Sequence, residues 1–224
     1  MEIQFLQWVD ATFHSQAWLN YIMKYITYIG EFGAGAIICA LVLLIFKKTR
    51  WAGVAVGCAL VLDVLIVNVI LKLSVNRARP WSEYEPFLDF YKAYGVRQPT
   101  DSSFPSGHSA ALFAAAVALT FRYKLKALPA IIIALLVALS RIYLCVHYPT
   151  DVLGGILIGS ACGVAGHFAA TGLKKLYDEK LAPLVQKRKG ITPEQPAGEA
   201  NEPQPEQQPD QQPEQTGSQQ PEQE

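Results

Sequence analysis

Five long apolar stretches, separated by short polar segments, organise most of the chain before residue 175. A bilayer core of roughly 30 Å is crossed by about 17–25 helical residues, and only helices pair all their own backbone groups in lipid. The pattern therefore predicts an all-α fold, a polytopic membrane helix bundle of five spans. The third stretch is short, and we expect it to extend by about one turn. The stretches are residues 30–46, 51–73, 106–121, 127–145 and 152–173.

The segment before the first span, residues 3–29, has a helical periodicity of its own. Lys24 and Glu31 lie in or beside it and oppose a simple crossing. We expect an N-terminal interfacial helix that lies in the plane of the membrane surface, with a sixth span as the alternative. Its apolar residues at helical spacing are Trp18, Tyr21, Ile22, Tyr25 and Ile29.

The composition changes after Lys189. Residues 1–189 hold 19 Lys and Arg against 11 Asp and Glu, whereas the remainder holds eight acidic residues and no basic one, so the formal net charge of +0 is a cancellation. The Pro-, Gln- and Glu-rich end has too little apolar surface to offset the entropy lost on folding. We therefore predict a membrane-embedded domain over residues 1–190 and a disordered acidic tail over residues 191–224.

Lys and Arg in the short loops predict the orientation, because cytoplasmic loops carry an excess of them. Basic residues cluster at 47–50, at 122–126 and at 174–175, so these segments and the tail should be cytoplasmic. The loops 74–105 and 146–151 should then lie on the extracytoplasmic side of the plasma membrane. The chemically suggestive residues all fall on that outer side. The loop 81–104 is rich in aromatics, which we interpret as an interfacial belt or as a determinant of substrate choice.

Three outer segments together suit a phosphate ion. A phosphate dianion favours cations, bidentate guanidinium groups and free backbone N–H groups at a helix N-terminus. Two of the cations, Lys72 and Arg79, have an alternative interpretation as boundary residues that snorkel to the interface. The segments are Lys72 to Pro80, Pro105-Ser106-Gly107-His108 at the start of the third span, and Ser140 to Asp151, which includes Arg141 and His147.

The last segment also offers a base and a group to orient it. Pro149 disfavours helix at the preceding residue, so a break falls between His147 and Asp151. An Asp that accepts from one ring nitrogen fixes the tautomer and leaves the other nitrogen free to attack. His108, on another span, is then available as the acid.

Two polar residues within the second span are interpreted differently. Asp63 precedes Lys72 by nine residues, about 180° around an α-helix, so we expect it to face away from the phosphate pocket. Asn68 is one turn from Lys72 on the same face, which allows a supporting role there.

The three segments resemble the type 2 phosphatidic acid phosphatase superfamily, whose pattern is K-x6-RP, then PSGH, then SR-x5-H-x3-D. The sequence matches all three in order between residues 72 and 151, with no departure at a catalytic position. The resemblance implies His147 as the nucleophile that forms a phosphohistidine, Asp151 as its orienting partner and His108 as the acid. It implies a phosphate cradle of Lys72, Arg79, Ser106, Gly107 and Arg141.

The function implied is an integral-membrane lipid phosphate or diphosphate phosphatase, a hydrolase that needs no cofactor and no metal ion. The expected partners are the bilayer and a phospholipid or polyprenyl phosphate substrate, with no nucleic acid. Undecaprenyl diphosphate is our best candidate substrate. The alternatives are a phosphatidylglycerophosphate or phosphatidic acid phosphatase, or a lipid phosphotransferase with the same site. A non-catalytic transporter or scaffold is disfavoured by the intact motifs.

The predicted orientation can be tested by labelling single cysteines at Ser82 and Thr216, in a background without the four native cysteines. An impermeant maleimide applied to intact cells should label position 82 and leave position 216 unlabelled until the cells are lysed. Labelling of position 216 alone in intact cells would reverse the orientation.

Overall fold

The computed structural model describes residues 1–184, and residues 1–183 form one compact helical unit. The predicted tail, residues 191–224, lies outside the described residues, so the domain boundary near residue 190 stays a prediction. The described part consists of helices and connecting segments without strands, as expected for an all-α fold.

Ten α-helices and four 3-10 or π segments follow one another along the described chain. The α-helices are α1 (Glu2–Phe13), α2 (Ala17–Tyr28), α3 (Ala34–Ile45), α4 (Arg50–Asp63), α5 (Lys72–Val75), α6 (Pro80–Glu83), α7 (Pro86–Tyr94), α8 (Gly107–Tyr123), α9 (Leu128–Tyr143) and α10 (Pro149–Leu176). The other segments are η1 (Glu31–Gly33) and η3 (Lys124–Ala127), both 3-10, and η2 (Val64–Leu71) and η4 (Tyr177–Leu181), both π.

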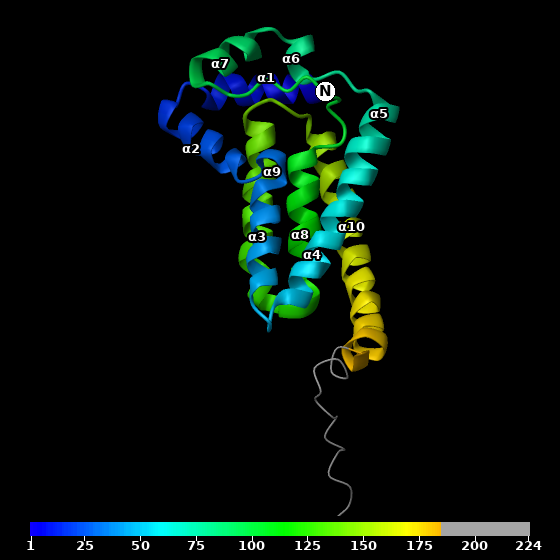
Figure 1. The fold of residues 1–224 in the computed structure, drawn as a ribbon. Helices are drawn as coiled ribbons and strands as arrows, with labels where there is room; N and C mark the ends of the chain where they lie inside the picture. Colours follow the sequence, from blue (N-terminus) through cyan, green and yellow to red (C-terminus); the bar gives the residue numbers. More distant parts are fainter. Residues whose placement is uncertain (185–224) are drawn as a thin grey trace, which may run out of the picture. The chain divides into compact units, whose positions relative to one another are not determined.

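Four helical stretches in residues 1–184 are long and apolar enough to cross a membrane, so the predicted count of five spans is not confirmed. They are Ala17–Ile45, Arg50–Glu83, Gly107–Tyr143 and Pro149–Leu184. The third contains both α8 and α9, which the sequence analysis treated as separate spans and which η3 joins almost without interruption. Lys124 at this junction has a left-handed φ of 50°, and the two helices run side by side in opposite directions (Figure 1). As expected, α8 extends beyond residue 121, to Tyr123.

The bundle is closely packed where α10 crosses α8 and α4. Alanines supply most of the buried core, and glycines of α10 lie directly on neighbouring backbone. A Cβ at Gly159 would overlap the carbonyl of Ala110 on α8, and a Cβ at Gly166 would lie 2.5 Å from the backbone nitrogen of Ala59 on α4. Small residues therefore let the helix backbones approach, as in other membrane bundles.

A cap of short helices lies across one end of this bundle (Figure 1). Helices α1 and α7 bury a second apolar cluster with the end of α9. Phe87, Phe90 and Tyr91 are buried in it, so the interpretation of these aromatics as an interfacial belt was wrong. They pack inward because α1 covers them, a contact between distant segments that sequence periodicity does not reveal.

The N-terminal segment forms two helices, α1 and α2, rather than one. The apolar residues whose spacing predicted a common face are all exposed along α2 and its C-terminal end, so they do share one outward side. Whether they lie in the interface stays a prediction. The chain then turns sharply into α3 through Phe32 (φ 50°) and Gly33 (φ 70°).

The basic segments share the opposite end of the bundle from the cap. Arg122 donates to the carbonyl of Lys48, and the Arg50 guanidinium lies 5.9 Å from the Tyr177 ring. The separation of basic loops from chemically suggestive residues, which the sequence predicted, is therefore present in the fold.

The packing of α10 predicts a difference between two glycines of this one helix. Gly159→Ala should destabilise the protein by about 1–3 kcal/mol through overpacking. Gly172→Ala, where nothing lies within 4 Å of an added Cβ, should be neutral or stabilising by up to about 1 kcal/mol. Thermal unfolding of both variants in detergent checks this. Equal melting temperatures would contradict the close contact of α10 with α8.

Candidate active site

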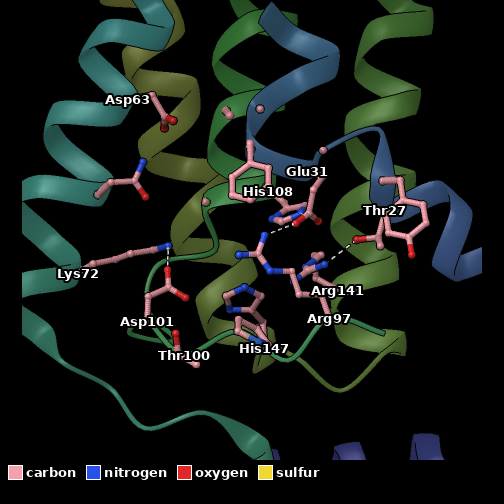
Figure 2. Close-up of a pocket in the computed structure, with 18 of the residues that line it drawn as sticks. Thr27, Glu31, Asp63, Lys72, Arg97, Thr100, Asp101, His108, Arg141 and His147 are labelled. Atoms are coloured by element: carbon pink, nitrogen blue, oxygen red, sulfur yellow. Dashed lines mark hydrogen bonds and ion pairs between the residues drawn. The ribbon is translucent and has the colours of Figure 1, made fainter. Parts of the chain in front are cut away.

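The three outer segments meet at the capped end of the bundle around one cavity of about 500 Å³. Six of the eight predicted site residues line it. They are Lys72, Arg79, Gly107, His108, Arg141 and His147. Figure 2 shows His108 and His147 facing the cavity from two different elements, α8 and the loop between α9 and α10. The other two, Ser106 and Asp151, are fully buried beside it.

His147 is held in a single tautomer. Its Nδ1 lies 2.8 Å from the carbonyl oxygen of Ser103, and because a carbonyl only accepts, Nδ1 carries the hydrogen. Nε2 is then the unprotonated nitrogen, and it lies 3.3 Å from Nη1 of Arg79 at the cavity. Burial lowers the pKa of His147, so the ring is neutral at pH 7. A neutral imidazole with one free nitrogen aimed at a cationic cavity is suited to attack an electrophile.

Asp151 supports His147 less directly than expected. Its Oδ2 lies 3.6 Å from Nδ1, beyond hydrogen-bond distance, and accepts instead from the Ser103 hydroxyl at 2.5 Å and the Tyr148 N–H at 2.9 Å. Its Oδ1 accepts from Arg77 at 2.6 Å. The carbonyl of Ser103 therefore orients the imidazole, and the carboxylate fixes Ser103.

The start of α8 offers backbone donors to the cavity. Gly107 is the first residue of α8 and lines the cavity near Lys72, whose Nζ would lie 3.5 Å from an added Cβ. The N–H groups of the first helical turn have no partner within the helix, and the helix dipole favours an anion there. Ser106 is the N-cap residue of α8, but its side chain makes no capping hydrogen bond. Its N–H donates to the Asp151 carbonyl at 2.9 Å, and its hydroxyl oxygen accepts from Ser109 at 3.0 Å.

A carboxylate lies between two of the cavity cations. Asp101 forms an ion pair with Lys72 (Figure 2). It forms another with Arg79, where Oδ1 accepts from Nη2 at 2.6 Å. Partial burial acts to raise the pKa of Asp101, but the contacts with Lys72 and Arg79 outweigh it and lower this pKa to about 2. Asp101 is thus an anion at neutral pH, in the place that suits an oxyanion.

Arg141 is the most enclosed of the cations. Its Nη1 donates to the Thr27 hydroxyl at 2.7 Å, and within residues 1–184 its buried Nε has no hydrogen-bond partner. An uncompensated buried donor is costly, and within the described residues the protein chain satisfies this guanidinium only in part.

His108 has a carboxylate partner that the sequence analysis did not assign to the site. Its Nε2 lies 3.3 Å from Oε2 of Glu31, whose Oε1 accepts from Arg97 at 2.9 Å. Gly30 packs so close to the imidazole that an added Cβ would lie 2.9 Å from Cδ2 of His108. The turn between α2 and α3 is therefore built against His108.

The prediction that Asp63 faces away from this pocket was wrong, because Asp63 lines the same cavity as Lys72. Residues between them form the π segment η2, whose i→i+5 hydrogen bonds advance fewer degrees per residue than an α-helix. The nine residues from Asp63 to Lys72 therefore do not place these two side chains on opposite faces of the helix. Asn68 lines the cavity, as its spacing suggested. Within residues 1–184, no group of three or more His, Cys, Asp or Glu side chains is placed to hold a metal ion.

Comparison with known proteins identifies relatives in sequence and in structure. A family model described as the PAP2 superfamily matches residues 52–171. The chain is 34% identical over 190 residues to phosphatidylglycerophosphatase B of Bacillus subtilis, covering 77% of this chain and 81% of that protein. It is 34% identical over 146 residues to an undecaprenyl-diphosphatase of Sulfolobus acidocaldarius, covering 64% and 67%. The crystal structure of a transmembrane PAP2-type phosphatidylglycerolphosphate phosphatase from Bacillus subtilis superposes with a TM-score of 0.58, 27% identity and coverage of 81% and 87%.

The position of Asp101 predicts that it competes with any bound oxyanion. Asp101→Asn should tighten binding of orthovanadate at pH 7 by about tenfold, because a negative charge within a few ångströms of the ligand is removed. Isothermal titration of the purified protein measures this. Asp89→Asn is the control, because Asp89 lies on α7 with an 84% exposed side chain that pairs only with Lys92.

Lowering the pH of the wild-type protein to 5 should not reproduce the effect, because the carboxyl of Asp101 protonates only near pH 2. Weaker vanadate binding by Asp101→Asn would show that Asp101 positions the cations rather than competing with the ligand.

Proposed function

Because the chain belongs to the PAP2 superfamily, we propose that it is a membrane phosphatase that removes a phosphate group from a lipid. The single observation that supports this most strongly is the shared cavity. It brings His147 and His108 to three cations, Lys72, Arg79 and Arg141, at the end of apolar helices. A lipid phosphate fits this arrangement, because its head group reaches the helix ends while its chains stay among exposed apolar side chains.

The substrate we favour is undecaprenyl diphosphate. One of the similar proteins is named for that activity and another for phosphatidylglycerophosphate. Phosphatidylglycerophosphate is therefore an alternative substrate for the same site. Phosphatidic acid is a further alternative. A lipid phosphotransferase would use the same residues but an acceptor other than water, so acceptor-dependent phosphate transfer would favour it.

The proposed reaction has two steps. First, Nε2 of His147 attacks phosphorus to form an N–P bond, while the bond from phosphorus to the lipid-side oxygen breaks and its electron pair stays on that oxygen. His108 gives this oxygen a proton. Water then attacks phosphorus and loses a proton to His108, while the N–P electron pair returns to His147 and phosphate is released. Throughout, Nδ1 of His147 keeps its hydrogen on the Ser103 carbonyl.

The cradle supplies electrostatic stabilisation. Lys72, Arg79, Arg141 and the N–H groups around Gly107 surround the position of the phosphoryl oxygens, where charge is held through the transition state. The phosphate takes the place of the Asp101 carboxylate between Lys72 and Arg79. Ser106 contributes through its position beneath the helix start.

We further propose that α8 and α9 cross the membrane separately, which gives five spans with the cradle on the extracytoplasmic side and the tail in the cytoplasm. His108 lies in the first turn of α8 and Arg141 near the end of α9, yet both line one cavity, so the chain runs away from the site and returns to it. A third single cysteine at Leu125, which is 87% exposed in the connecting turn, extends the labelling experiment. Labelling of both 82 and 125 in intact cells would contradict the two crossings.

The two histidines should fail in different ways. His147→Ala removes the nucleophile, so turnover should stop for every substrate. His108→Ala removes the acid, worth about 10²–10⁴-fold in rate for an alcohol leaving group such as that of phosphatidic acid or phosphatidylglycerophosphate. An aryl phosphate, whose leaving group needs little protonation, should recover much of its rate in His108→Ala and none in His147→Ala.

Phosphate release from a lipid and an aryl substrate, measured for both variants, checks this assignment. Asp151→Asn should fall between them, since the imidazole stays in place while its support through Ser103 weakens. Recovery of aryl phosphate turnover by His147→Ala would mean that the two roles are assigned the wrong way round.

A further inference from the structure

Two cations line the cavity beyond the phosphate cradle. Lys24, half-buried on α2, has no carboxylate partner within residues 1–184, and its ammonium lies 5.9 Å from the Tyr28 ring. Arg97, in the loop after α7, lies 4.6 Å over the Phe32 ring and donates to Glu31. Neither belongs to the motifs that define the cradle, and Lys24 is costly to hold near the bilayer without an anion.

Arg97 lies on the His108 side of the cavity, and Lys24 is near it, because its Nζ would lie 3.2 Å from a Cβ added at Gly95, two residues before Arg97. Glu31 joins Arg97 to His108, the proposed acid, through its two carboxylate oxygens. Lys72 and Asp101 lie on the opposite side of the cavity from Arg97 and Glu31 (Figure 2). A group attached to the oxygen that His108 protonates therefore comes within reach of Arg97 if it leaves on the side away from Lys72 and Asp101.

The charge around the phosphate cradle differs from the charge around Lys24 and Arg97, and the difference indicates which phosphate each half binds. The cradle holds three cations, Lys72, Arg79 and Arg141. A terminal phosphate, which carries about −2, suits this half of the cavity once it displaces the Asp101 carboxylate. The second half holds Lys24 and Arg97 against Glu31, a net charge of +1. It matches a phosphate in a diester-type linkage, which carries one negative charge.

Building on the function proposed above, we infer that Lys24 and Arg97 form a second anion subsite that binds the inner phosphate of a lipid carrying two phosphate groups. Both a diphosphate and a phosphatidylglycerophosphate-type head group carry a terminal phosphate and a singly charged inner phosphate, joined directly as an anhydride in the first and through a glycerol in the second. Phosphatidic acid lacks the second phosphate. The subsite selects two-phosphate lipids over one-phosphate lipids, and it does so on the side where the leaving group departs.

The test compares substrates in the purified full-length protein. The specificity constant kcat/KM for phosphate release is measured with a polyprenyl diphosphate, with phosphatidylglycerophosphate and with phosphatidic acid, in Lys24→Gln, Arg97→Gln and the wild type. Lys92→Gln is the control, since this lysine is 78% exposed on α7 and pairs only with Asp89. Loss of a charge-assisted contact should lower the ratio of two-phosphate to phosphatidic acid activity by about 10–100-fold in Lys24→Gln. Lys92→Gln should leave the ratio unchanged.

The choice of substrates separates a failure of the subsite from a failure of the proposed phosphatase function. If the ratio falls for only one of the two-phosphate lipids, the subsite recognises the inner phosphate of that lipid and not that of the other. A proportionate loss on all three lipids, or no loss on any, would overturn the subsite while leaving the phosphatase assignment intact. A wild-type protein that releases phosphate from none of them would instead contradict the proposed function itself.

Discussion

The fold is organised by the need to hold positive charge at the end of an apolar bundle. Five cations line one cavity of about 500 Å³, and Arg141 has a buried Nε without a partner in the described chain. Charges removed from water are costly unless they are paired. The chain provides partial compensation through Asp101 and Glu31, each of which bridges two positively charged or protonatable groups. We propose that a phosphate ester completes this compensation.

Several elements of the fold bring these groups together. The start of α8 and the end of α9 converge because the two helices run in opposite directions, and Gly159 and Gly166 let α10 approach the bundle closely. The cap of α1, α6 and α7 covers the loops that carry the site, and Tyr91 donates to the carbonyl of Cys145 just before His147. The turn at Gly30 brings Glu31 against His108.

Motif spacing was enough to predict that three distant segments meet, and six of the eight named residues do line the cavity. Apolar stretches likewise predicted the all-α bundle. The missed features depend on three-dimensional contacts. Asp63 was misplaced because a π segment is invisible to an assumption of regular α-helix. Four residues of the site were missed because each contacts a partner far away in the sequence, and no local pattern reveals such a contact. Glu31 pairs with His108, Ser103 with His147, and Arg77 with Asp151. Asp101 pairs with both Lys72 and Arg79. An acidic residue beside two glycines in an otherwise apolar stretch was the one available signal for Glu31.

The central claim is that the neutral imidazole of His147, fixed by the Ser103 carbonyl, takes the phosphoryl group on Nε2. The most direct measurement is to react the protein briefly with a lipid radiolabelled in its terminal phosphate, quench in alkaline detergent, in which phosphohistidine survives, and map the labelled peptide. The account predicts label on His147, alkali-stable and acid-labile, and no label in His147→Ala. Label on His108 or on any serine would contradict it.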